Sequence, residues 1–140
     1  YMLANSSFLI NKGNNNSLQL LCPYPVDQDK LVFFLNAADV IILTSYNEGS
    51  PNIIKEAMAC CKPIVSTNVG DVEWLFGDEP GHFIAGFDAF DFSEKLKLAL
   101  DFTKIHESTS GKKRLLELGL DSESIAKRII SVYKSVLNVD

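Results

Sequence analysis

In the first part of this chain the hydrophobic residues form short continuous runs, and towards its end they recur at helical spacing. The run at 40–43, Val-Ile-Ile-Leu, is apolar at every position, which is typical of a strand covered on both faces in a parallel sheet. Shorter apolar runs predict further strands at 18–22, 64–66 and 83–85. Because helical segments alternate with these runs, the pattern indicates an α/β fold.

Helical patterns lie between and after the strands. Asp27 is expected to cap a helix whose buried face carries Leu31, Phe34 and Leu35, and a short helix is expected at 72–76. Three more helices are predicted beyond residue 90, with starts at 92–93, at 112–114 and at a Ser122 cap. The last one has apolar residues at 4-3-4 spacing, which predicts a buried stripe made of Ile125, Ile129, Val132 and Val136.

The turn and helix after the run at 40–43 have the clearest functional pattern. Ser50 is a favourable N-cap, and Pro51 suits the first helical position because its missing N–H would be unpaired there. Gly49 allows the backbone to approach a ligand closely. The free N–H groups and the dipole of the first turn favour a phosphate or another anion at this point.

Two carboxylates with seven residues between them, Glu48 and Glu56, bracket this turn. Glu56 lies about 9 Å along the helix, with its side chain leaning back towards the N-terminus. A carboxylate there can accept hydrogen bonds from vicinal hydroxyls such as those of ribose, while Glu48 is better placed for a second polyol such as a sugar. The alternative is that both are ordinary exposed glutamates, but the combination of strand, turn, cap and apolar stripe favours a ligand site.

Four segments occur in a specific order along the chain: NAADV at 36–40, EGSP at 48–51, KEAMAC at 55–60 and KPIVSTNVGDV at 62–72. This ordered set resembles the donor-binding domain of GT-B glycosyltransferases, most closely the retaining family 4 (group 1) with its E-x7-E signature. The resemblance implies a single domain over 1–140 with a Rossmann-like parallel sheet flanked by helices. It would be the N-terminally truncated, C-terminal half of a GT-B fold, without the acceptor domain.

The resemblance also implies roles for individual residues. Glu56 would hold the ribose hydroxyls of a nucleotide sugar, and Glu48 would lie near the donor sugar as the candidate catalytic carboxylate. The backbone that would line the diphosphate and sugar belongs to Gly49, Ser50, Pro51, Asn52 and Ile53. The loop expected against the base contains Tyr24, Pro25 and Val26. Relatives carry an Arg and a Lys that neutralise the diphosphate, in a segment that has no match here.

The function implied is retaining, hexosyltransferase-type transfer from a nucleotide-diphosphate sugar to an acceptor, without a protein nucleophile, metal or cofactor. The expected partners are the nucleotide sugar and an N-terminal acceptor domain, onto which the final helix of GT-B proteins often crosses back. Because GT-B sites lie between two domains, the isolated domain is expected to be almost inactive. Two alternatives remain open: a nucleotide-binding module without transferase chemistry, and another GT-B relative such as a sugar-phosphate epimerase.

Composition narrows the function classes further. A net charge of −5 argues against nucleic-acid binding, which requires a basic face. No apolar run approaches 18 residues, so no transmembrane segment is predicted, although peripheral membrane contact of the full enzyme stays open. Three cysteines, two of them adjacent, favour a reducing, cytoplasmic compartment.

Several other conspicuous residues are expected to be structural. His82 and His106 have no second ligand at metal-binding spacing, and Trp74 is expected in the core. The basic run at 112–114 is expected to be a solvated face, because adjacent charges do not share one helix face. Cys61 stands where relatives have Gly after the helix, so a small strain is expected there. Packing roles are expected for Phe33, Phe34, Phe87, Phe90 and Phe92.

Overall fold

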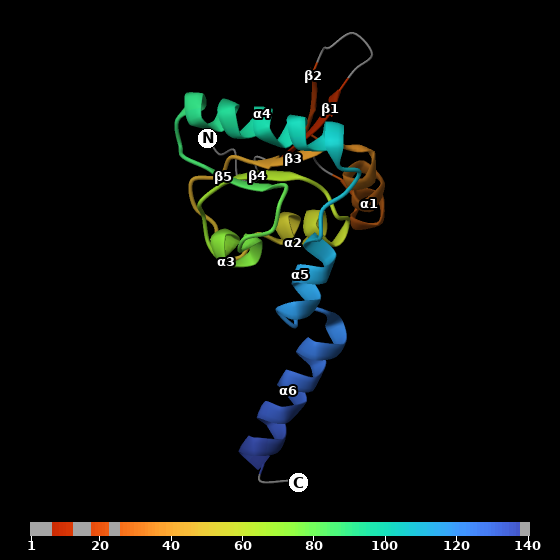
Figure 1. Ribbon diagram of the computed structural model, residues 1–140. Coiled ribbons are helices and arrows are strands. Elements are labelled where there is room, and N and C mark those ends of the chain that lie inside the picture. Colours follow the sequence, from red (N-terminus) through yellow and green to blue (C-terminus); the bar gives the residue numbers. More distant parts are fainter. Residues whose placement is uncertain (1–6, 13–17, 23–25, 138–140) are drawn as a thin grey trace.

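The computed structural model describes residues 7–12, 18–22 and 26–137 (Figure 1). The strands are β1 (Ser7–Lys12), β2 (Leu18–Leu21), β3 (Val40–Leu43), β4 (Ile64–Thr67) and β5 (His82–Ala85). The helices are α1 (Gln28–Ala37), α2 (Asn52–Ala59), α3 (Val72–Phe76), α4 (Ala89–Ile105), α5 (Gly111–Glu117) and α6 (Ser122–Leu137). Strands and helices alternate from β2 to α4, and two further helices follow. The predicted α/β class, with a Rossmann-like arrangement of parallel strands and helices, is confirmed.

The strands form one sheet in the order β2-β1-β3-β4-β5. β3, β4 and β5 are parallel, as the apolar run at 40–43 predicted. β1, in contrast, pairs antiparallel with both β2 and β3, and neither this strand nor its direction was predicted. The sheet is therefore mixed, and its parallel part carries the loops that matter for the candidate site.

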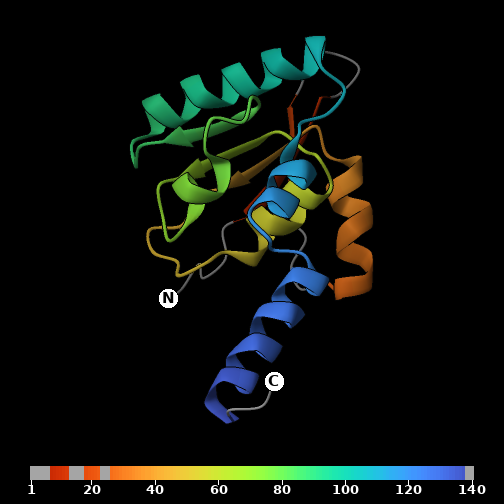
Figure 2. The ribbon, with the colours of Figure 1, turned by 60° about the horizontal axis from the view of Figure 1, so that its bottom comes forward.

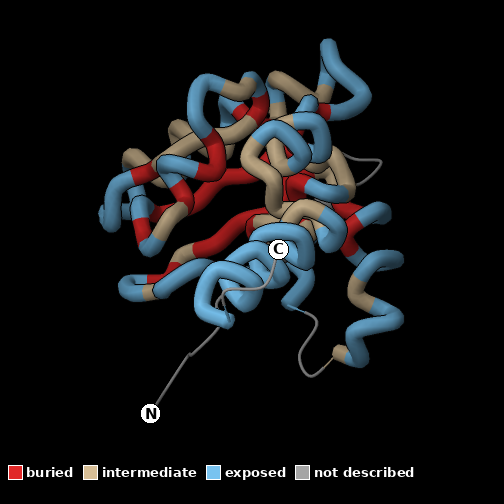
Figure 3. The backbone as a smooth tube through the Cα atoms, turned by 90° about the horizontal axis from the view of Figure 1, so that it is seen from below, coloured by how far each residue is buried: buried red, intermediate tan, exposed pale blue. Residues whose placement is uncertain are grey.

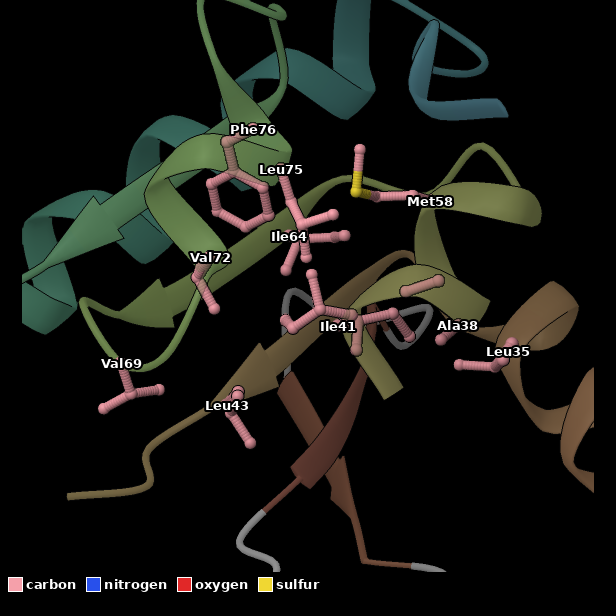
Figure 4. Packing of buried hydrophobic residues seen from close by; sticks show 12 residues of the cluster. Leu35, Ala38, Ile41, Leu43, Met58, Ile64, Val69, Val72, Leu75 and Phe76 are labelled. Carbon is pink, nitrogen blue, oxygen red and sulfur yellow. The ribbon is translucent and has the colours of Figure 1, made fainter. Parts of the chain in front are cut away.

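Helices cover both faces of the parallel strands: α4 lies on one face, and α2, α3 and α5 lie on the other (Figures 1 and 2). The alternation of β3 side chains explains this arrangement, since successive residues of a strand point to opposite faces. Ile41 and Leu43 pack with α2 and α3 in the larger core cluster (Figure 4). Val40 and Ile42 belong to a second cluster that contains Ala99 of α4.

The end of α2 has the geometry of a Schellman motif. The Cys61 N–H donates to the Met58 carbonyl at 2.9 Å, and the Lys62 N–H donates to the Ala57 carbonyl at 3.0 Å. Cys61 itself has φ 55°, in the left-handed region that glycine adopts at low cost. The strain expected from cysteine at this position is therefore present in the backbone.

Helix starts differ in detail from the sequence expectation. Asp27 occupies the N-cap position of α1, but its side chain makes no capping hydrogen bond. α4 begins at Ala89, before the predicted start at 92–93, because the Asp88 side chain caps it by accepting from the Asp91 N–H. Asp121, and not Ser122, caps α6 through a 2.9 Å bond from the Ser124 N–H.

α6 projects away from the rest of the described chain, and none of its residues is buried (Figures 1 and 3). The predicted stripe is exposed, from 38% at Ile125 to 72% at Val136. The prediction that it is buried is wrong within the described residues, because no described element packs over it.

Aromatic residues were the least predictable part of the core. Trp74 is 51% exposed, so its assignment to the core is wrong. The predicted packing also fails for four phenylalanines that are exposed, namely Phe33, Phe34, Phe87 and Phe90. Phe92 packs against the smaller core cluster, as predicted. His82 is largely buried against the ring of Phe76, with centroids 4.9 Å apart.

Candidate functional site

After the loop that follows β3, helix α2 begins one residue later than predicted. Pro51 is the N-cap, with an extended backbone, and Asn52 is the first helical residue. Ser50 does not cap the helix because its hydroxyl donates to Asp71 Oδ2 at 2.6 Å. No side chain caps α2, so the N–H groups at its start are left for an anion or for water.

Lys55 also belongs to this site, although its spacing in the sequence did not predict that its side chain reaches the start of α2. Its Nζ lies 2.8 Å from Ser50 Oγ, so the ammonium folds back to the beginning of α2. Helical side chains lean towards the N-terminus, and this tendency is the signal that points to Lys55. Lys62, in contrast, donates to the Asn36 carbonyl at 2.7 Å and lies elsewhere.

Glu56 lies beside the beginning of α1. Its Oε1 accepts a hydrogen bond of 3.0 Å from Gln28 Nε2, and Gln28 is the first residue of α1. Burial raises the pKa of Glu56 above its usual value, and the positive charge of Lys55 opposes this rise. Val26, two residues before Gln28, is half-buried; Tyr24 and Pro25 lie outside the described residues.

Glu48 is held at the carboxyl ends of the parallel strands. Its Oε1 accepts from Ser45 Oγ at 2.8 Å. The Ser45 carbonyl in turn accepts from Thr67 Oγ1, at the end of β4, at 2.6 Å. These two bonds tie the loop that carries Glu48 to the neighbouring strand, which is the edge where open α/β sheets bind ligands.

A second turn supports the same loop from the side. Gly70 has φ 56°, and a Cβ added to it would lie 2.3 Å from the Gly49 carbonyl oxygen. The turn between β4 and α3 therefore packs backbone to backbone against the turn that contains Glu48 and Gly49. Asp71, the next residue, keeps its Oδ1 buried without a hydrogen-bond partner among the described residues.

A cavity of about 840 Å³ opens beside Glu48, between the loop after β3 and the start of α4. It is lined by Thr44, Ser45, Tyr46, Asn47, Glu48, Thr67, Gly86, Phe87, Asp88, Ala89, Phe92, Ser93 and Leu96. Glu56 does not line it. The two carboxylates of the motif thus face different surroundings: Glu48 faces the cavity, and Glu56 faces α1.

Residues 7–12, 18–22 and 26–137 provide neither a metal-binding cluster nor a membrane-spanning helix. No group of three or more His, Cys, Asp or Glu side chains there could hold a metal ion. None of the helices described is long and apolar enough to cross a bilayer. In the basic run at 112–114, Arg114 is used structurally, since it donates to the carbonyls of Trp74 and Leu75.

Comparison with protein families gives a match to the model for glycosyl transferases group 1 over residues 10–116. A similar protein is the N,N'-diacetylbacillosaminyl-diphospho-undecaprenol alpha-1,3-N-acetylgalactosaminyltransferase of Campylobacter jejuni. It is 32% identical over 108 residues, which cover 76% of this chain and 29% of that protein.

D-inositol 3-phosphate glycosyltransferases are similar as well. The chain is 35% identical over 78 residues to one from Catenulispora acidiphila, covering 55% of the chain and 18% of that protein. It is 34% identical over 91 residues to one from Corynebacterium jeikeium, covering 64% and 21%. The chain thus spans less than a third of the length of these curated relatives. No solved structure matches it significantly.

Proposed function

The chain belongs to the group 1 glycosyltransferases, and on this premise we propose that it binds the nucleotide-diphosphate sugar in a retaining, hexosyltransferase-type enzyme. The observation that carries the proposal is the arrangement around α2. A helix start without a side-chain cap lies next to a lysine, with Glu56 on one side and Glu48 at the strand ends.

The nucleoside would bind at Glu56. Its carboxylate would accept hydrogen bonds from the ribose hydroxyls, with the loop of Tyr24, Pro25 and Val26 against the base. The Gln28 to Glu56 hydrogen bond supports this proposal, because it brings the chain just after that loop to the carboxylate. Glu56 is also held in place by this bond before a ligand arrives, which lowers the cost of binding.

The diphosphate would bind at the start of α2. The backbone of Gly49, Ser50, Pro51, Asn52 and Ile53 would line it, and the helix dipole would favour its charge. Lys55 would supply a positive charge, since its ammonium already lies beside Ser50. Lys55 would thus provide a positive charge from this chain to neutralise the diphosphate leaving group.

The chemistry would consist of positioning and charge stabilisation. Glu48 would orient the sugar, and the α2 start with Lys55 would stabilise the charge that develops on the departing diphosphate. No protein nucleophile, metal or cofactor enters this scheme. The acceptor would be bound by an N-terminal domain, which would also cover the apolar face of α6. The chain by itself would therefore be nearly inactive.

We place the full enzyme in the cytoplasm, which suits the free cysteines Cys22, Cys60 and Cys61. Peripheral contact with a membrane is compatible with the proposal, and nucleic acid is not an expected partner.

The experiment that tests the proposal is calorimetric titration of the chain with UDP, GDP and ADP. One nucleotide should bind, and Glu56→Ala should weaken its affinity about tenfold to a hundredfold, because it removes charge-assisted hydrogen bonds worth about 1.5–3 kcal/mol. Glu107→Ala makes the same charge change at an exposed position of the α4–α5 connection and serves as the control. Equal losses in both variants would contradict the role of Glu56.

A module that only binds nucleotide, or a sugar-phosphate epimerase, would pass the same titration. Hydrolysis of the donor nucleotide sugar by the full-length protein separates these alternatives, since neither of them releases the sugar to water or to an acceptor.

A further inference from the structure

Asp71 stands at the N-cap position of α3, but it does not cap that helix. Aspartate at an N-cap commonly accepts a hydrogen bond from an N–H of the first helical turn, whereas the Asp71 side chain makes no such bond. Its Oδ2 accepts instead from Ser50 Oγ at 2.6 Å. Ser50, also a favourable capping residue, leaves the start of α2 without a side-chain cap. Two capping residues are thus bonded to each other, and both helices lack a local stabilising bond.

The protons of this contact have one arrangement. The Lys55 ammonium has donors but no acceptor, so Ser50 Oγ is the acceptor in their 2.8 Å contact. The single hydroxyl proton of Ser50 is then directed at the Asp71 carboxylate, which can only accept. The 2.6 Å distance is typical of a charge-assisted O–H···O⁻ bond. Lys55, Ser50 and Asp71 are therefore connected by hydrogen bonds that run from a cation to an anion.

The Asp71 carboxylate is held in place on both sides. Val72, the next residue, is fully buried in the larger core cluster, and a Cβ on Gly70, the residue before, would lie 2.3 Å from the Gly49 oxygen. Asp71 Oδ1 is buried and has no hydrogen-bond partner among residues 7–12, 18–22 and 26–137. A buried oxygen without a partner lowers stability, and so does the missing cap of α3. Folding therefore does not explain this carboxylate, whereas a role in orienting Ser50 and Lys55 does.

Both residues that Asp71 orients belong to the start of α2. Because Ser50 Oγ is engaged by Asp71 and Lys55, it makes no bond to the first N–H groups of this helix, and these stay open to an anion. The Lys55 side chain is ordered before an anion arrives, which removes a cost that binding would otherwise include. Ser50 uses one of the three ammonium protons, so two remain for a ligand or for water.

We propose that Asp71 is a positioning residue for the diphosphate: through Ser50 it holds the Lys55 ammonium at the start of α2 and keeps the N–H groups there uncapped. This inference rests on the proposed binding of a nucleotide diphosphate, and it adds a residue that does not touch the ligand. It also predicts an effect opposite in sign to that of charge alone. Removal of a carboxylate near an anion site should by itself strengthen anion binding, whereas removal of Asp71 should weaken it.

The test is calorimetric titration of UDP, GDP and ADP into the chain and its variants at low salt. Asp71→Ala should weaken the affinity for the nucleotide that binds about threefold to tenfold, since Lys55 must then be ordered during binding. Asp71→Asn keeps an oxygen acceptor for Ser50 and should lose less. Asp78→Ala is the matched control, because it removes the same charge at an exposed position between α3 and β5 and should not weaken binding.

A double variant distinguishes positioning from a general loss of structure. Once Lys55→Met has removed the ammonium, the addition of Asp71→Ala should cause no further loss of affinity, whereas independent effects would multiply. Urea denaturation checks that each variant is folded under the conditions of the titration. The inference is refuted if Asp71→Ala binds the nucleotide at least as tightly as the unchanged chain, if Asp71→Asn and Asp71→Ala lose equally, or if the losses multiply.

A measurement without ligand separates failure of this inference from failure of the proposed function. In ¹H–¹⁵N NMR spectra of the lysine ammonium groups, the Lys55 signal is assigned by its absence in Lys55→Met. It should be visible in the unchanged chain and in Asp78→Ala, and it should be lost in Asp71→Ala, because a released ammonium exchanges its protons rapidly with water. If none of the three nucleotides binds to the unchanged chain, the proposed function fails. A Lys55 signal that persists in Asp71→Ala overturns the positioning role, whatever the nucleotides do.

Discussion

Gly70 gives the sharpest test of how the site is supported. Its backbone is left-handed, with φ 56°, and the space where a side chain would start is filled by the neighbouring turn. A Cβ there would lie 2.3 Å from the Gly49 oxygen and 2.8 Å from the Gly49 carbonyl carbon. Gly70→Ala must therefore push the turn that holds Glu48, in addition to straining its own backbone.

The two costs can be estimated separately. The left-handed conformation costs a non-glycine residue about 1–2 kcal/mol, and overpacking typically costs about 1–3 kcal/mol. Gly70→Ala should thus lower the free energy of unfolding by about 2–5 kcal/mol. Gly119→Ala isolates the first cost, because Gly119 has φ 63° but no atom closer than 3.6 Å to an added Cβ. It should lose only about 1–2 kcal/mol.

Urea denaturation of the two variants and the unchanged chain measures this difference through the midpoint and the m-value. The control reports on the same core, because Leu118 and Leu120, on either side of Gly119, pack against the larger core cluster. Gly70→Ala should also weaken nucleotide binding, since it displaces Gly49. Equal losses of stability in the two variants would refute the close packing of the two turns.

Three further changes test other parts of the structure. Cys61→Gly should raise the free energy of unfolding by about 1 kcal/mol, because it relieves the left-handed backbone at φ 55°; an unchanged urea midpoint would contradict this. Burial lowers the pKa of His82 to about 4, below its unfolded value near 6.5. The contribution of neutral His82 to the free energy of unfolding should therefore be fully present above about pH 6.5. It should be lost, by up to about 3 kcal/mol, as the pH drops to 4. His82→Leu should flatten that pH dependence, and a profile that keeps its slope would exclude His82 as the cause. Lys55→Met should weaken nucleotide affinity about tenfold at low salt and less at high salt, whereas Lys112→Met, at an exposed position of α5, should not; equal calorimetric affinities of the two variants would contradict the role of Lys55.

The elements nearest the site were predictable because their signals are local. The continuous apolar run at 40–43 identified β3, and the Gly-Ser-Pro turn identified the beginning of α2 to within one residue. The error at Ser50 has a tertiary cause, since its hydroxyl bonds to Asp71, 21 residues further along the chain. No local pattern contains that partner.

The remaining differences also come from long-range contacts. The cavity depends on Phe87 stacking on Tyr46 and on α4 starting at Ala89, and neither follows from residue spacing. The stripe of α6 shows that periodicity predicts an apolar face but not what covers it. Trp74 shows the same limit for a single large residue, whose exposure depends on whether another element reaches it.

The exposed position of α6 has a consequence for how docking of the proposed N-terminal domain can be followed. A helix of 16 residues without tertiary packing is marginal in water, so its amide hydrogens should exchange rapidly with solvent. Covering its apolar face would slow that exchange, while the core strands, already protected, would change little. The exchange rate along α6 should thus report whether the proposed N-terminal domain is docked, without the need for a substrate.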